Sequence, residues 1–96
     1  MSISNTIKQD LIGLVSGHDW SYMMSDSHSV WEAGMKVDKE IQAKIHALCA
    51  IHKEDADRLK GIVRGIAGSD YTDYDSSGYG LKYRTINSWF KPYIGE

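Results

Sequence analysis

The chain has 96 residues, of which 42% are hydrophobic and 25% charged, and its formal net charge is −2. This composition is typical of one small globular domain over residues 1–96 and excludes a disordered or multidomain chain. No run approaches the roughly 18 apolar residues of a membrane-spanning helix, and no secretory signal is visible, so we expect a cytoplasmic protein without membrane partners. The nearly balanced charge also argues against non-specific nucleic-acid binding.

The first predicted helix spans residues 4–15, with Ser4 or Asn5 as its cap and Gly17 as its stop. Four apolar side chains recur there at helical spacing: Ile7, Leu11, Leu14 and Val15. Residues 18–29 are rich in Ser and Asp and show no sustained periodicity. We therefore predict an ordered loop, held in place by Trp20 and Tyr22.

A much longer helical pattern covers about residues 29–67, with Ser29 and Glu32 as a capping box and Gly68 after its end. Its apolar face follows steps of three or four residues: Val37, Ile41, Ile45, Leu48, His52, Ala56, Leu59, Val63 and Ile66. A straight helix of this length would measure about 57 Å, which is too long for a compact small domain. Two alternatives stay open. One is a helical hairpin that turns near 52–54, and the other is a rod whose apolar face pairs with a second chain in a homo-oligomer.

Two glycines near the end of this pattern, Gly61 and Gly65, either allow another element to pack closely or are simply tolerated. Residues 69–80 form a polar, tyrosine-rich loop, and residues 81–94 follow as a short strand or helix. Thr85 as a cap favours one or two helical turns that end before Pro92. The prediction is therefore a mainly α fold. It consists of a short N-terminal helix, a long helix or helical hairpin, the tyrosine-rich loop and a short C-terminal helix.

Three groups of side chains have types that can bind metals or transfer protons. The first contains His18, Asp19, Asp26 and His28, the second His46, Cys49 and His52, and the third Asp73, Asp75, Ser77 and Gly78. We interpret the first group as helix caps and loop hydrogen bonds, and the second as a buried thiol beside a histidine at the edge of the core. The third matches half of a calcium-binding loop, but Arg84 stands where the bidentate glutamate should be. We therefore expect no metal and no cofactor.

Aromatic residues are concentrated near the C-terminus. Trp89 and Phe90 have the spacing of core residues, whereas the other aromatic side chains lie among polar and basic ones. Tyrosine and arginine contribute much of the binding energy at protein interfaces. The candidate binding surface consists of Tyr71, Tyr74, Tyr79, Lys82, Tyr83 and Arg84.

The segment from Tyr22 to Gly34 reads Tyr-Met-Met-Ser-Asp-Ser-His-Ser-Val-Trp-Glu-Ala-Gly. It resembles a Tyr-x-x-Ser-Asp-(Asp/Ser)-His-x-Val-Trp-x-x-Gly stretch of small uncharacterised bacteriophage proteins. The resemblance assigns no functional residue to this chain. The resemblance implies a phage context, in which short non-enzymatic proteins act by binding host machinery, including defence systems. In physical terms the segment predicts a loop-to-helix junction anchored by Trp31.

No phosphate-binding loop, dinucleotide-binding glycine motif or nucleophile motif occurs, so we expect a protein that is not an enzyme. The leading hypothesis is stoichiometric binding to a host or phage protein, with inhibition of a host system such as defence as its role. We also expect a homo-oligomer that forms through the long helix. The alternative is a small-nucleotide or nucleic-acid binder in which tyrosines stack on bases while Lys82, Arg84 and Lys91 contact phosphates. A lower alternative is a metal-dependent hydrolase that uses His18, Asp26 and His28.

Overall fold

The computed structural model describes residues 5–68 and 80–94, and every regular element within these ranges is helical. Four α-helices follow one another: α1 (Asn5–Gly17), α2 (His28–Ile51), α3 (Ala56–Ala67) and α4 (Leu81–Ile94). Two short 3-10 helices, η1 (Trp20–Met24) and η2 (Lys53–Asp55), lie in the connections before and after α2. The prediction of a mainly α fold is confirmed.

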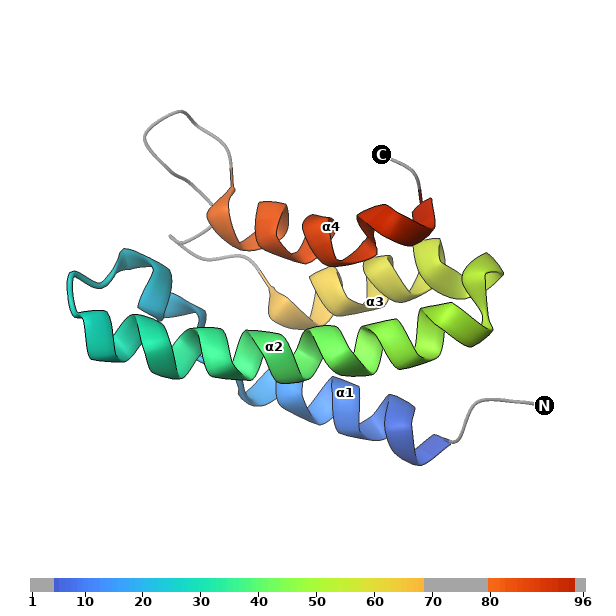
Figure 1. Cartoon of the computed structure of the whole chain (residues 1–96), viewed down its shortest axis with the longest axis horizontal. Helices are drawn as coiled ribbons and strands as arrows, with labels where there is room; N and C mark the ends of the chain where they lie inside the picture. Colours follow the sequence, from blue (N-terminus) through green and yellow to red (C-terminus); the bar gives the residue numbers. More distant parts are fainter. Residues whose placement is uncertain (1–4, 69–79, 95–96) are drawn as a thin grey trace.

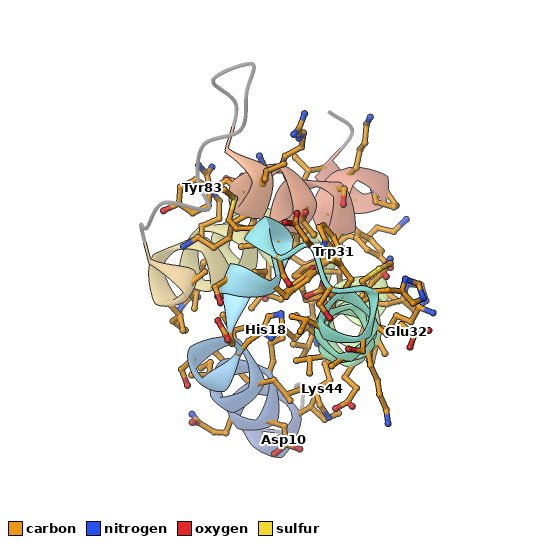
Figure 2. The ribbon with its side chains drawn as sticks, turned by 90° about the vertical axis from the view of Figure 1, so that its left-hand side faces the viewer. Asp10, His18, Trp31, Glu32, Lys44 and Tyr83 are labelled. Atoms are coloured by element: carbon orange, nitrogen blue, oxygen red, sulfur yellow. The ribbon has the colours of Figure 1, made fainter. Side chains whose placement is uncertain are left out.

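The axes of the four α-helices are roughly aligned, successive helices run in alternating directions, and together they surround a shared core (Figure 1). α1 packs on α2 and α3, and α4 packs on the same two helices. Seen along the bundle, α1 therefore lies opposite α4, and α2 lies opposite α3 (Figure 2). All four helices contribute fully buried side chains to this core, among them Leu11, Val15, Ile41, Ile45, Val63, Ile86 and Phe90.

The long apolar pattern is interrupted at His52. Its backbone leaves the helical region, with φ −127° and ψ 72°, and η2 then leads the chain into α3. Ile41 and Ile45 on α2 and Val63 on α3 all face the interior. The helical hairpin is therefore confirmed and the continuous rod is wrong. Because the apolar face is buried within one chain, it no longer supports homo-oligomerisation through that face.

Serine and glycine set several helix ends. Ser27, not Ser29, caps α2. Its Oγ accepts a hydrogen bond from the Val30 backbone N–H, with 3.5 Å between nitrogen and oxygen, so the predicted capping box is wrong. Gly68 follows α3 with φ 71°, the left-handed backbone predicted for it. A Cβ atom at Gly61 or Gly65 would meet nothing within 4 Å, which favours tolerance over close packing at both positions.

Two connecting regions differ from the prediction. Residues 18–29 contain η1 rather than only a loop, although Trp20 and Tyr22 are buried and hold this segment as expected. α4 is longer than predicted, since the Thr85 hydroxyl donates to the Leu81 carbonyl inside the helix, and Pro92 lies within its last turn. Most of the predicted tyrosine-rich loop, residues 69–79, lies outside the described residues.

Candidate functional site

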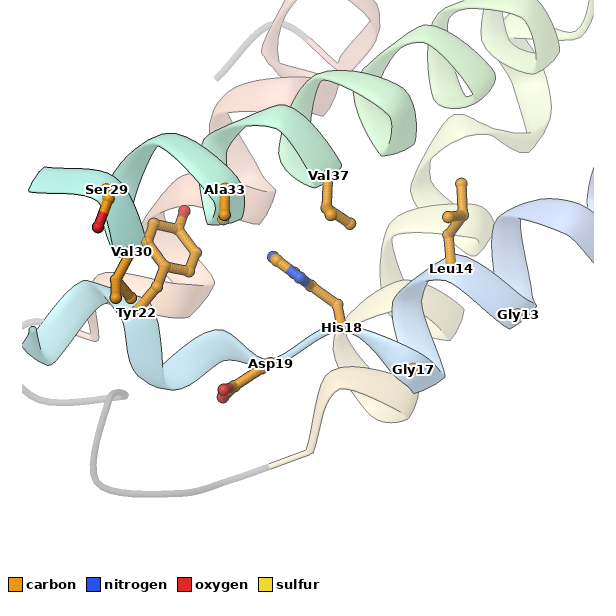
Figure 3. A pocket seen from close by; sticks show the side chains of 11 residues that line it. Gly13, Leu14, Gly17, His18, Asp19, Tyr22, Ser29, Val30, Ala33 and Val37 are labelled. Atoms are coloured by element: carbon orange, nitrogen blue, oxygen red, sulfur yellow. The ribbon is translucent and has the colours of Figure 1, made fainter.

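An open groove of about 530 Å³ lies between the C-terminal end of α1 and the first turns of α2 (Figure 3). Its walls are mainly apolar and include Leu14, Val30, Ala33 and Val37. Among the described residues that line it there is no lysine or arginine, and Asp19 is the one carboxylate. The groove therefore suits an apolar group that carries no negative charge.

A buried polar network lies beside this groove. His18, the first residue after α1, lines the groove and places its Nε2 2.7 Å from Asp38 Oδ1. The side chains of His18 and Asp38 are only 3% and 12% exposed. The Tyr22 hydroxyl donates to Asp38 Oδ2, so both carboxylate oxygens have a partner. A buried carboxylate needs such partners, because an unpaired charge in the interior is costly.

The network determines which atoms carry protons. Burial, the hydrogen bond to Asp38 and the negative charge of Asp38 all raise the pKa of Tyr22 above its ordinary value of 10.0, so its hydroxyl stays protonated. A carboxylate only accepts hydrogen bonds, so His18 Nε2 must carry the hydrogen. In the neutral imidazole, Nδ1 is then the acceptor.

Asp38 is the residue of this site that the sequence analysis missed. It precedes Ile41 by three residues and Ile45 by seven, so it lies on the buried face of α2. A carboxylate at this spacing within an apolar face indicates a buried polar partner. That spacing was visible in the sequence, but it could not show that the partners would be His18 and Tyr22.

The junction between η1 and α2 closes one end of the groove. The Tyr22 ring lies over Gly34 so closely that a Cβ there would overlap it. Trp31 meets Tyr22 edge-on, with ring centroids 5.0 Å apart, and its Nε1 donates to the Ser25 carbonyl over 2.8 Å. The predicted loop-to-helix junction anchored by Trp31 is confirmed. The tyrosine, serine, tryptophan and glycine of the motif thus have a structural role.

The predicted binding surface is only partly described. Tyr71, Tyr74 and Tyr79 lie outside the described residues, and Arg84 is exposed on α4. Tyr83 is half-buried, donates its hydroxyl hydrogen to the Gly68 carbonyl and carries the Arg64 guanidinium 4.6 Å above its ring centre. Its ring and its hydroxyl are thus already engaged within the protein.

Lys82 requires a correction, because it is fully buried instead of belonging to an exposed surface. Its Nζ donates to the Ala67 carbonyl over 3.1 Å. The last carbonyls of a helix lack intrahelical partners and lie at the negative end of the helix dipole, so a cation is favoured there. Lys82 therefore closes the end of α3.

The first group of candidate metal ligands does not converge. His18 is buried beside Asp38, whereas Asp26 and His28 are exposed, with His28 3.3 Å from Glu32 on the next turn of α2. Asp19 accepts hydrogen bonds from the backbone and hydroxyl of Ser21 and so caps η1. This arrangement does not favour the hydrolase alternative.

The second group is also dispersed. His46 is hydrogen-bonded to the Tyr93 hydroxyl, and Cys49 is buried. Burial and the nearby Asp55 carboxylate raise the pKa of the Cys49 thiol, which disfavours the thiolate that binds metals. His52 points instead toward exposed Glu54, with 3.5 Å between Nδ1 and Oε1. The interpretation as a buried thiol beside a histidine at the core edge is confirmed. The half-matched calcium loop at 73–78 lies outside the described residues.

No family model, curated protein or solved structure matches this chain. Among the helices of residues 5–68 and 80–94, none combines the length and the apolar character needed to cross a membrane. The groove and the polar network beside it are therefore the features from which a function can be inferred.

Proposed function

We propose that this protein acts by stoichiometric binding to another protein and that the groove between α1 and α2 is the binding site. The observation that carries the proposal is an open, mainly apolar groove on a small domain. Val30 at its edge is 42% exposed, and Met24, at the end of the adjoining η1, is 49% exposed. Apolar surface gathered around a groove is typical of interaction sites.

The groove supports protein binding better than nucleotide binding. A nucleotide needs cationic or amide donors for its phosphates, and no lysine or arginine is among the described residues of the groove. On α4, Lys82 and Tyr83 donate hydrogen bonds to the end of α3. Fewer side chains are therefore left for base stacking and phosphate contact than the sequence suggested. Nucleotide binding through Tyr71, Tyr74, Tyr79 and Arg84 stays the alternative.

The partner we propose is a host or phage protein in the bacterial cytoplasm. The support is the resemblance of residues 22–34 to small phage proteins, together with the expectation that the chain is not an enzyme. Inhibition of a host system such as defence is the role this context favours. A second copy of the chain is a competing occupant of the groove, and light scattering distinguishes it by mass.

Replacing either of two alanines of α2 by arginine tests the groove. Ala33 and Ala43 are both exposed, but only Ala33 lines the groove. Arginine at position 33 should fill the groove and introduce a charge, whereas arginine at position 43 should add the same side chain elsewhere on the helix. We expect wild type and Ala43→Arg to retain one partner from a bacterial lysate in a stoichiometric complex. Ala33→Arg should bind that partner at least about tenfold more weakly, since a buried unpaired charge costs more than 1.4 kcal/mol.

Two results would contradict this proposal. One is equal binding of the partner by both variants, which would place the interface elsewhere. The other is the absence of any stoichiometric partner combined with stabilisation of the protein by nucleotides or oligonucleotides in a thermal-shift assay, which would favour the nucleotide alternative.

A further inference from the structure

We infer that the groove receives an aromatic side chain of the partner that carries its own hydrogen-bond donor, tryptophan best of all, and that His18 Nδ1 accepts this bond. The inference rests on the proposed function, because it specifies the chemical group that enters the groove. It goes further by assigning a specificity-determining atom.

The orientation of His18 supports this assignment. Asp38 holds Nε2, and the Trp20 ring packs against the imidazole edge-on with centroids 4.5 Å apart. A 3% exposed ring held from two sides cannot turn freely to suit a ligand. Since Nε2 carries the hydrogen, the neutral ring offers an acceptor at Nδ1. In the described part of the chain, this nitrogen has no hydrogen-bond partner.

The lining of the groove defines the rest of the occupant. Leu14, Ala33 and Val37 favour an apolar body, and no lysine or arginine is among the described lining residues to pair with an anion. An indole ring buries a large apolar area and has one N–H that needs a partner when it is buried. A volume of about 530 Å³ also leaves room for neighbouring side chains of the segment that carries the ring.

Indole and 1-methylindole test the donor directly, because the methyl group removes the N–H and keeps the rings. Binding to the 15N-labelled protein is followed by NMR, at a pH at which the 15N shifts of the His18 ring show it to be neutral. We expect indole to bind with a Kd of about 1 mM, as befits a ligand of this size. 1-Methylindole should bind about fivefold more weakly, since it lacks one hydrogen bond. Ala33→Arg should weaken the binding of both ligands, and Ala43→Arg should leave the binding of both unchanged.

The Asp38→Asn substitution tests the role of His18. Asparagine keeps one acceptor and gains one donor. With its carbonyl oxygen accepting from the Tyr22 hydroxyl, its amide donates to Nε2, the ring hydrogen moves to Nδ1, and the groove presents a donor in place of an acceptor. With the ring hydrogen on Nδ1, the fivefold preference for indole should disappear, and 1-indanone, a bicyclic ligand with a carbonyl acceptor, should bind more tightly than indole. The 15N shifts of the His18 ring report which nitrogen is protonated. A merely structural role for Asp38 would not change the order of the ligands.

Several outcomes would overturn the inference. Equal binding of indole and 1-methylindole by the wild type would do so even if Asp38→Asn fails to fold. An unchanged ligand order in Asp38→Asn, with the ring hydrogen shown to have moved to Nδ1, would do so as well. Loss of a protein partner in Ala33→Arg without any preference for indole would remove this inference and leave the proposed function intact. Preference for indole without any protein partner would support the hydrogen bond to His18 and contradict the proposed function.

Discussion

Two regions in the described part of the chain bury polar side chains for different purposes. Beside the groove, His18, Asp38 and Tyr22 come from three segments and bind one another through their side chains. At the contact of α3 and α4, Lys82 and Tyr83 donate to the carbonyls of Ala67 and Gly68, which are backbone groups at a helix end. The second region completes the hydrogen bonding of α3. The first holds one imidazole at the wall of an open groove.

The difference teaches how to separate structural from functional polar groups in a small domain. A helix end needs donors for its last carbonyls whatever the protein does, so a buried lysine there has a sufficient structural explanation. A carboxylate in the middle of an apolar helix face has no such backbone to satisfy, and an apolar residue would serve stability there at least as well. The groove region is therefore where function is expected, and substitutions in the two regions should behave differently.

The largest effect is expected for Gly34→Ala in the groove region. The added Cβ would need the space of the Tyr22 ring, so the ring would have to move and give up its bond to Asp38. The free energy of unfolding should fall by about 3 kcal/mol, combining overpacking with a lost hydrogen bond. Urea denaturation followed by circular dichroism measures it. Gly61→Ala is the control, since its new Cβ meets nothing within 4 Å and should stabilise the helix by about 1 kcal/mol. Equal stability of wild type and Gly34→Ala would contradict this packing.

Lys82→Met should have a smaller effect, in the other region. Methionine keeps the apolar stem but leaves the Ala67 carbonyl without this buried donor. The free energy of unfolding should fall by about 2 kcal/mol. Lys91 on the same helix is exposed, so Lys91→Met should change it by less than about 0.5 kcal/mol. If the two variants denature at the same urea concentration, Lys82 does not close the end of α3.

Tyr22→Phe should be milder still, with a loss of about 1.5 kcal/mol, because it removes one donor to Asp38 and retains the ring over Gly34. The same denaturation experiment measures this loss. The comparison of the regions becomes sharper if indole binding is recorded as well. Tyr22→Phe leaves the His18–Asp38 bond in place and should keep the preference for indole over 1-methylindole. If Tyr22→Phe has the free energy of unfolding of the wild type, the Tyr22 hydroxyl does not stabilise Asp38.

The smallest effect concerns alkaline pH. The pKa of Tyr22 is raised in the folded protein, so the folded state holds this proton more tightly than the unfolded state does. Its contribution to stability is complete below the ordinary value of 10.0 and is lost as the pH rises above it. At pH 10 the loss should be about 0.4 kcal/mol, because half of the unfolded-state tyrosine is then ionised. The measurement is the difference in pH dependence between wild type and Tyr22→Phe, and identical pH dependence would contradict it.

Helix positions could be predicted from residues close together in the chain, but these residues could not decide between a turn near 52–54 and a continuous helix. No glycine or proline occurs at residues 52–55, and apolar spacing continues across them. Breaking the helix there loses a few local hydrogen bonds and allows α3 to bury Leu59 and Val63 within the same bundle. This gain depends on contacts with other helices, which spacing along one segment does not reveal.

The site was less predictable than the fold. His18 was singled out as a possible ligand, but its partner Asp38 lies twenty residues later, and the intervening Asp26 and His28 offered a closer but mistaken grouping. Lys82 and Tyr83 looked like a basic aromatic surface because sequence shows residue type without burial. In the structure, the end of α3 takes up both side chains.

The amino-acid sequence by itself determined a small, mainly helical domain, the apolar faces of its helices and the junction anchored by Trp31. These properties follow from side-chain spacing and short-range hydrogen bonds. Only the tertiary structure decided that the long pattern folds into a hairpin, that Lys82 is buried and that His18 meets Asp38 beside an open groove. The physical reason is that burial and the pairing of buried charges are set by contacts between segments distant in the chain, which compete with every local preference.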